Sequence, residues 1–287
     1  YKRQIVGNGK YIINQYPLKN KTLLSGEKLF LLTNDKEIKM ENKHIVPLNI
    51  PSYLVDFKQR LRPSCFMSIA QEMAMEAAGV LHFGFEDLAE HELAWVLSRT
   101  KLVFHKVPMW KDRVEFHTWH KGVNGLYFIR DYRMLGEDGS TLVDGTSSWI
   151  TLNTKTRSLF RTDELDRWYD ITPQCTDDAL EENAGKIVVP KDSELVASHT
   201  VKYSDVDFIG HANNTSYVTW AMDCLPEELL RDNFPHIVEI NFNKETRGGE
   251  VVDIYRKVRE DETSTIVLFE GRVNGLPHFT ARFTYEK

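Results

Sequence analysis

Residues 66–81 read FMSIAQEMAMEAAGVL, and this stretch decides the fold. Its apolar side chains recur at helical spacing: Met67, Ala70, Ala74, Ala77, Ala78 and Leu81. This periodicity predicts a long helix with a broad apolar face. A short alternating stretch at 53–57 precedes it and is interpreted as an opening strand.

Strand patterns follow the helix, after a loop at Gly84. Val114, Phe116 and Thr118 alternate with polar neighbours, as in a strand with one buried face. Three other segments have similar character, and a turn signal at 136–139 separates the last two. The four predicted strands are 95–104, 114–119, 126–134 and 141–152.

The same order of elements occurs again after residue 200. A helix is predicted over 215–230, with Asn213 or Asn214 as its cap. Strands follow at 237–243, 251–258, 265–273 and 278–285, and Asn274-Gly275 is a strong hairpin signal between the last two. The architecture is therefore α+β, with an apolar helix wrapped by an antiparallel sheet, formed twice. The repeat is one of element order and not of visible sequence.

The chain divides into four predicted regions. Residues 1–39 carry eight Lys or Arg against three Asp or Glu, whereas the whole chain of 287 residues has a net charge of −6. They are interpreted as an extension, with the functional fold starting near Met40; a packed N-terminal arm is the alternative. Residues 40–161 and 193–287 are the two repeated units, and the acidic segment 162–192 is a linker.

Composition excludes several classes of protein. The net negative charge disfavours a nucleic-acid binder. Three cysteines at irregular spacing fit neither a zinc site nor a disulfide framework, and they indicate a reducing, cytoplasmic compartment. No apolar run is long enough to span a membrane, and no signal peptide is evident. No metal site is predicted, because His117 and His120 lie three apart in a predicted strand and would point to opposite faces. No cofactor is predicted, and neither a phosphate-binding glycine loop nor a serine nucleophile elbow is evident.

One polar cluster stands out between a predicted strand and the second helix. Residues 203–214 read YSDVDFIGHANN, which holds more Asp, His and Asn than a turn needs. Residues 243–249, NKETRGG, place Glu245 at a strand end that can face this cluster. The plainer alternatives are a solvated loop with an Asn cap and an ordinary surface carboxylate.

A family resemblance joins these segments. The string from Asp205 to Asn214 resembles the active-site loop of hot-dog thioesterases, and other motifs point to the acyl-acyl carrier protein (ACP) thioesterases of plant plastids and bacteria. The other motifs are Gln71-Glu72, Trp95-Val96-x-x-Arg99, Trp119 before Asn124-Gly125, and Ser148-Trp149-x-x-x-Asn153-x-x-Thr156-Arg157. The resemblance covers about Leu54 to the C-terminus and implies a tandem, or double, hot-dog fold.

The resemblance implies Asp207, His211 and Glu245 as catalytic residues. An Asn that the family keeps between Asp and His is replaced here by Ile209, and Thr246 replaces a cysteine sometimes found after the Glu. The implied chemistry is hydrolysis by an activated water. Either Glu245 or Asp207 is the base, and backbone amides at the start of the second helix stabilise the oxyanion.

The resemblance also implies a division of labour between the halves. The first half has no Asp/His pair at 60–65, so it is expected to supply the acyl pocket, with Met73 and Trp95 as contributors. Asn213 and Asn214 are the expected substrate-binding amides.

The expected partner is an acidic ACP, docking on cations, to a monomer or homodimer. The candidate cations are Arg60, Arg62, Lys106, Lys111 and Arg113. An acyl-CoA thioesterase and a non-catalytic acyl-chain binder remain as alternatives.

Overall fold

The computed structural model describes residues 43–287 except 166–168, 170–172, 174 and 176. Before residue 43 it describes four short strands, paired in the order β1-β2-β3-β4: β1 (Gln4–Val6), β2 (Lys10–Ile12), β3 (Thr22–Ser25) and β4 (Lys28–Leu31). The role assigned to residues 1–39 rests largely on positions outside the described residues, so it stays a prediction.

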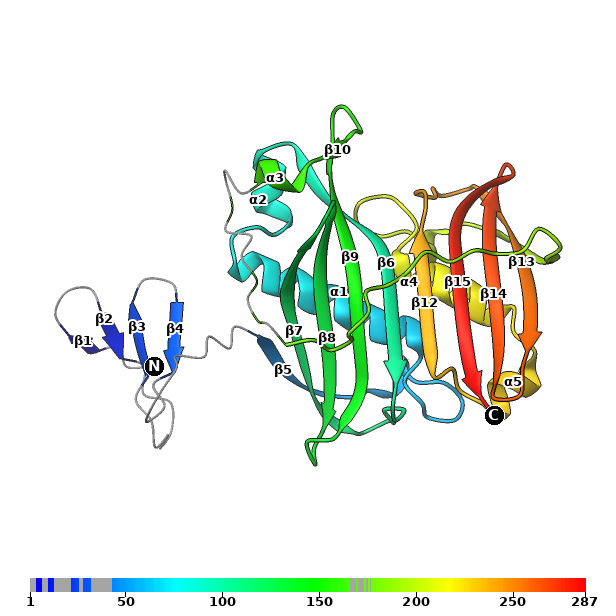
Figure 1. Cartoon of the computed structure of the whole chain (residues 1–287), viewed down its shortest axis with the longest axis horizontal. Coiled ribbons are helices and arrows are strands. Elements are labelled where there is room, and N and C mark those ends of the chain that lie inside the picture. The colour runs from blue at the N-terminus through cyan, green and yellow to red at the C-terminus, as the bar shows by residue number, and fades with distance from the viewer. Residues whose placement is uncertain are drawn as a thin grey trace.

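One antiparallel sheet runs through both halves of the chain (Figure 1). Its order is β11-β13-β14-β15-β12-β6-β9-β8-β7-β5, and β10 pairs with β9. The first half contributes β5 (His44–Asn49), β6 (Leu93–Phe104), β7 (Arg113–Asn124), β8 (Tyr127–Gly136), β9 (Thr141–Asn153) and β10 (Leu159–Phe160). The second half contributes β11 (Glu194–Thr200), β12 (Ile237–Phe242), β13 (Val251–Glu260), β14 (Ser264–Val273) and β15 (Leu276–Glu286). The two half-sheets meet where β12 pairs with β6, with Ile240 opposite Thr100.

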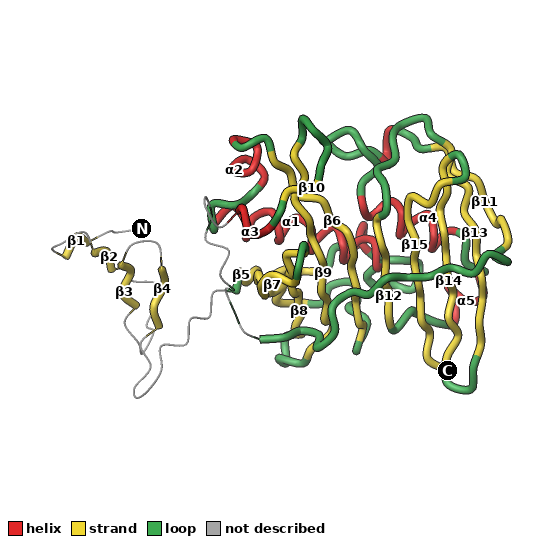
Figure 2. Tube along the Cα trace, turned by 45° about the horizontal axis from the view of Figure 1, so that its top comes forward, coloured by secondary structure: helices red, strands yellow, loops and turns green. Residues whose placement is uncertain are grey.

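Two helices lie along one face of this sheet, one in each half (Figure 2). The long one is α1 (Pro63–Val80), and its counterpart is α4 (Asn214–Asp223). Shorter helices complete the set: η1 (Ser52–Leu54), α2 (Phe85–Glu90), α3 (Thr162–Leu165), η2 (Tyr203–Asp205) and α5 (Glu227–Asp232). The predicted α+β fold, with a helix wrapped by a sheet in each half, is confirmed.

The core explains why each helix is held in place. Phe66 of α1 packs on Phe104 and Phe116, with ring centroids 5.9 and 5.5 Å apart. Tyr217 of α4 packs on Phe279, 5.2 Å away. All belong to one continuous apolar cluster that extends through both halves. Burying large aromatic side chains is the main force holding helix to sheet.

Two details of the predicted element order are wrong. The helix predicted over 215–230 is interrupted, because α4 ends at Asp223 and Pro226 caps a separate helix, α5. Proline has no backbone N–H to continue a helix and disfavours helical geometry in the residue before it. The opening strand predicted at 53–57 is a helical turn and loop, whereas the strand itself is β5.

The chain before each long helix follows the same path in the two halves. Val55 bridges Leu61 in the first half, and Val206 bridges Ala212 in the second. Leu61 donates its backbone N–H to Pro108, and Ala212 donates its N–H to Thr246. The loop therefore recurs, with Val55-Asp56-Phe57 in one copy and Val206-Asp207-Phe208 in the other. The sequence is repeated here as well as the architecture.

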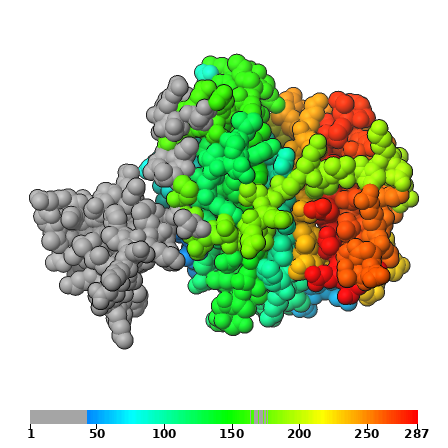
Figure 3. All heavy atoms as spheres, viewed as in Figure 1, coloured from blue at the N-terminus to red at the C-terminus, as the bar shows by residue number. Residues whose placement is uncertain are grey.

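Residues 177–192 of the segment predicted as a linker run across the face of the sheet seen in Figure 3, and Figure 1 shows α1 and α4 behind that sheet. Asn241 of β12 accepts a hydrogen bond from the Ile187 amide at 2.7 Å and donates one to the Gly185 carbonyl at 2.9 Å. Ile187 and Ala184 are buried by this contact. The described part of this connection therefore packs on the fold.

Candidate functional site

The polar loop of the second half forms a tight turn just before α4. The Asp207 N–H donates to the His211 carbonyl at 2.9 Å, and the Gly210 N–H donates to the Asp207 carbonyl at 3.0 Å. Gly210 has a φ of 92°, which a residue with a side chain rarely adopts. The Asp207 carboxylate accepts the backbone N–H of Ile209 at 2.9 Å. The turn therefore fixes the position of Asp207 and the direction in which the backbone leaves the turn at His211.

Glu245 comes from the chain between β12 and β13 and meets His211. Glu245 Oε2 lies 3.3 Å from His211 Nε2. A backbone bridge between His211 and Arg247 aligns the two segments. The sequence cluster at 203–214 and the strand-end carboxylate are thus brought together.

The other oxygen of Glu245 faces two guanidinium groups. Oε1 lies 2.5 Å from Arg157 and 3.2 Å from Arg247. Partial burial by itself would raise the pKa of Glu245. The hydrogen bonds from Arg157 and Arg247 and the electrostatic effect of His211 and Arg157 outweigh burial and hold the pKa of Glu245 below its usual value. Glu245 is therefore an ionised carboxylate at neutral pH.

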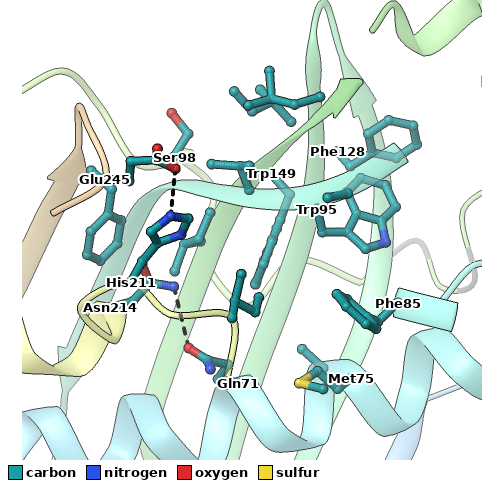
Figure 4. A pocket seen from close by; sticks show the side chains of 18 of the residues that line it. Gln71, Met75, Phe85, Trp95, Ser98, Phe128, Trp149, His211, Asn214 and Glu245 are labelled. Atoms are coloured by element: carbon teal, nitrogen blue, oxygen red, sulfur yellow. Dashed lines mark hydrogen bonds and ion pairs between the residues drawn. The ribbon is translucent and has the colours of Figure 1, made fainter. Parts of the chain in front are cut away.

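A cavity of about 620 Å³ opens beside this pair and extends into the first half (Figure 4). His211, Glu245 and Asn214 lie at one side of it, while Phe85, Trp95 and Phe128 lie away from them. The wall between is largely apolar: Ala74, Ala78, Phe83, Leu97, Trp149 and Ile150. Its size and lining suit an extended apolar ligand with one polar end.

The proposed substrate-binding residues have different places. Trp95 lines the cavity, with its indole N–H donating to the Phe83 carbonyl at 2.9 Å. Asn214 also lines it and donates to Gln71 Oε1 of α1 at 3.4 Å. Asn213 instead caps α4, because its Oδ1 accepts the Thr215 N–H. Met73 packs in the core and is not among the described residues that line the cavity; Met75, two positions on, is.

These placements bear on the amide that Ile209 replaces. Ile209 lines the cavity but offers only an apolar side chain to it. Asn213, the expected substitute, uses its carbonyl oxygen as a helix cap. Asn214 therefore is the loop amide that faces the cavity.

A half-buried network of hydrogen bonds supports the loop at 203–214. Asp205 accepts hydrogen bonds from the Lys202 N–H at 2.7 Å and the Trp220 indole at 3.1 Å, and it lies 2.8 Å from His199. Burial tends to raise the pKa of Asp205, but these hydrogen bonds and the nearby His199 lower it overall. The Asp205 carbonyl also accepts the Asn213 N–H at 2.8 Å, which ties the network to the start of α4.

The residues that sequence reasoning missed lie mostly on strands of the first half. Phe128 and Ser98 line the cavity from β8 and β6, and Trp149, quoted only as part of a motif, lines it from β9. Strand alternation predicts which residues share a face, but it does not distinguish cavity lining from closed core. Arg157 was noted only as part of a motif, and its contact with Glu245 spans 88 positions of sequence.

The five cations expected to dock a carrier do not surround this cavity in the described part of the chain. Arg60 is occupied by Asp56 at 2.8 Å and by the carbonyls of Leu230 and Asn233. Arg62 donates to the Tyr53 carbonyl. The exposed cations that line the cavity are others, Arg157 and Lys244, and Arg247 lies beside them against Glu245.

The fold and the site define a double hot-dog protein with a histidine–carboxylate pair beside an apolar cavity. Residues 41–166 match the acyl-ACP thioesterase N-terminal domain, and residues 189–287 match the acyl-ACP thioesterase C-terminal domain. The chain belongs to the acyl-ACP thioesterase family, so the family resemblance seen in the sequence is confirmed.

Curated relatives agree with this assignment. A chloroplastic palmitoyl-acyl carrier protein thioesterase of Gossypium hirsutum is 29% identical over 235 residues, which covers 76% of this chain and 56% of the relative. Oleoyl-acyl carrier protein thioesterase 2 of Arabidopsis thaliana is 25% identical and covers 71% of this chain and 60% of the relative. The chain thus spans between half and two thirds of the length of these relatives.

Solved structures share the fold. An acyl-ACP thioesterase from Bacteroides thetaiotaomicron superposes with a TM-score of 0.77 at 23% identity, covering 85% of this chain and 98% of that one. The 12:0-ACP thioesterase from Umbellularia californica gives a TM-score of 0.74 at 20% identity, covering 86% and 95%. Among the described residues, no helix is long and apolar enough to cross a membrane.

Proposed function

We propose that this protein hydrolyses the thioester of acyl-ACP, which releases a free fatty acid and ends chain elongation. The observation that carries the proposal is the 3.3 Å pairing of His211 with Glu245 at the side of a long apolar cavity. The acyl group lies in the part of the cavity formed by the first half of the polypeptide. The thioester lies against the second half. Membership of the acyl-ACP thioesterase family supports the same reaction.

The reaction needs a water activated by a carboxylate. Glu245 accepts a proton from water while the oxygen attacks the thioester carbonyl carbon. The negative charge that forms on the carbonyl oxygen is stabilised by the backbone N–H of Asn214 at the start of α4, since the N–H groups of Asn213, Thr215 and Ser216 already donate within the protein. The tetrahedral intermediate collapses, the C–S bond breaks, and the thiolate takes up a proton through His211.

Glu245 is favoured over Asp207 as the base because of its contacts. Both carboxylates line the cavity, and Glu245 is the one that meets His211, at 3.3 Å. The Asp207 carboxylate accepts a backbone N–H of its own turn and thereby shapes the loop. We assign Asp207 to holding the loop and Asn214 to orienting the thioester or the water.

The carrier docks at the cavity mouth in this proposal. Arg157 and Lys244 line the cavity there, Arg247 lies against Glu245, and these exposed cations suit an acidic partner. KM for acyl-ACP should therefore rise with salt concentration, since exposed charges are screened. A KM that does not change with salt concentration would contradict docking of the carrier on these cations. The compartment, predicted as the cytoplasm from cysteine usage, and the choice between monomer and homodimer stay predictions.

One experiment tests the activity and separates its rivals. Release of free thiol is measured with acyl-ACP and acyl-CoA substrates over a series of chain lengths. The wild-type protein should release thiol faster from acyl-ACP, and Glu245→Gln and His211→Ala should each lose about 100-fold or more in kcat. Glu92→Gln, which changes an exposed carboxylate paired with Lys155, is the matched control.

Two outcomes would overturn the proposal. Faster release from acyl-CoA would make the protein an acyl-CoA thioesterase. Tight acyl binding with no release from either carrier would make it a binding protein, in which Ile209 marks a lost catalytic amide.

A further inference from the structure

The side chain of Arg157, in the first half of the chain, contacts the carboxylate of Glu245 in the second half. It lies just after β9, in the turn that connects β9 to β10. Its guanidinium lies 2.5 Å from Glu245 Oε1, and this contact in turn raises the pKa of Arg157. Arg157 also lines the cavity. It is thus a contact between the half that holds the acyl pocket and the half that holds the histidine.

The backbone at Arg157 is held in an unfavourable shape. Its φ is 58°, in the left-handed region that side chains disfavour. Asn153 stabilises the turn: its Oδ1 accepts the N–H groups of Lys155 and Thr156 at 3.0 and 2.9 Å. The Asn153 carbonyl accepts the Arg157 N–H at 2.9 Å. Strain kept in place by such a turn is a reason to look for a role of the strained residue.

The contacts of Glu245 are divided between its two oxygens. Arg157 and Arg247 lie against Oε1, and His211 lies against Oε2. Arg157 is the closer of the two arginines. A guanidinium presents donors in a fixed plane, so it fixes the orientation of a carboxylate as well as its charge.

We propose that Arg157 is a positioning residue for thioester hydrolysis, which holds Glu245 by Oε1 so that Oε2 stays directed at His211. This inference rests on the proposed function. Arg157 does not itself exchange a proton with substrate or water. It acts through Glu245, and it makes the catalytic carboxylate depend on the first half of the chain.

The pH dependence of kcat/KM is the readout that a merely structural role would not move. Loss of the Arg157 charge weakens the preference for ionised Glu245, so the pKa of Glu245 rises. The reaction needs Glu245 as a carboxylate, and therefore the acid limb of the pH profile should move to higher pH in Arg157→Gln. At neutral pH we expect kcat to fall by about tenfold or more, with a smaller change in KM.

Two further variants control the experiment. Arg157→Lys keeps the charge but not the planar donor pair, so the acid limb should return towards the wild-type position while kcat recovers only in part. Lys155→Gln removes a neighbouring exposed charge that pairs with Glu92, and its pH profile should match the wild type. An unshifted acid limb in Arg157→Gln would overturn the proposal, whether or not kcat falls.

A second measurement separates this inference from the proposed function. The titration of the Glu245 carboxyl group is followed by NMR in wild type and Arg157→Gln without substrate. An increase in its pKa in the variant supports the positioning role even if no acyl-ACP is hydrolysed. Equal pKa values in the two proteins would contradict it, even if the wild type proves to be a thioesterase.

Discussion

Arg60 stands in the first half of the chain where His211 stands in the second. Arg60 bridges Met109, and His211 bridges Arg247, at the same point of the repeated loop. Gln59 and Gly210, the residues before them, both have positive φ. The residue corresponding to Glu245 is Val107, since Pro108 and Thr246 accept equivalent hydrogen bonds. The loop of the first half keeps the aspartate, as Asp56, but it has neither the histidine nor the glutamate of the second half.

The first prediction concerns this first loop. Arg60 is bound to Asp56 and to two carbonyls at the end of α5, so Arg60→Gln should lower the free energy of unfolding by about 1–3 kcal/mol. The rate of thioester hydrolysis at 25 °C should not change. Urea unfolding and kcat measure the two effects, with the more exposed Arg62→Gln as control. A loss of kcat without a loss of stability would show that the first loop takes part in the reaction.

The second prediction concerns the acyl cavity. Ala78 of α1 is buried and lines the cavity, so Ala78→Leu fills part of it. Hydrolysis of the longest accepted acyl chains should fall by about 10–200-fold in kcat/KM, while shorter chains are affected less. Gly79→Ala is the control, because a Cβ at Gly79 meets nothing within 4 Å. An equal loss at all chain lengths would argue that Ala78 does not lie along the acyl chain.

The third prediction uses the lowered pKa of Asp205. A carboxyl group with a lower pKa in the folded state stabilises the fold above its unfolded pKa, and this contribution is lost as pH falls through the folded pKa. Asp205→Asn should therefore cost about 1–2 kcal/mol at pH 7, and the difference from wild type should shrink below about pH 4. Urea unfolding at several pH values checks this.

Asp192→Asn is the matched control for Asp205→Asn, because Asp192 pairs with Lys257 on the surface. It should have little effect on unfolding at any pH. A stability difference for Asp205→Asn that persists unchanged at pH 3 would mean that the loss comes from packing and not from charge.

The fourth prediction concerns the pairing of β14 with β15. Gly271 lies opposite Phe279, and a Cβ built at Gly271 would come 2.0 Å from the Phe279 ring. Phe279 is fully buried, so its ring cannot move away without disturbing the core. Gly271→Ala should lower stability by about 3 kcal/mol. Gly185→Ala, which meets nothing within 4 Å, should be close to wild type in thermal unfolding.

The fold was predictable because its signals are local. The apolar spacing of 66–81 and the alternation around Val114 each depend on a few neighbouring residues, and α1 and β7 are found there. Pro226 was an available signal for the end of α4, and it was overlooked. The repeated triplets beginning at Val55 and Val206 were equally visible. Their meaning emerges once both loops are seen to precede equivalent helices.

The site was less predictable because its contacts cross the chain. His211 and Glu245 were joined by a family resemblance, and no local pattern links them. The partnership of Arg157 with Glu245 depends on how two half-sheets meet, which sequence periodicity does not determine. The cavity likewise takes residues from both halves. The buried face of a helix or strand is determined by residues close in sequence. The position of a cavity depends on where side chains from distant segments fail to fill the space between them.

The pairing of β12 with β6 makes the two halves one sheet within a single polypeptide. In an assembly of identical subunits, any substitution appears in every copy of the loop, so replacing the histidine by arginine would abolish all active sites together. A single polypeptide that contains both loops is free of this constraint, because each loop is encoded separately. One loop can then take substitutions that suit a purely architectural role without altering the other. Arg60 and His211, at equivalent points of the two loops, illustrate this independence.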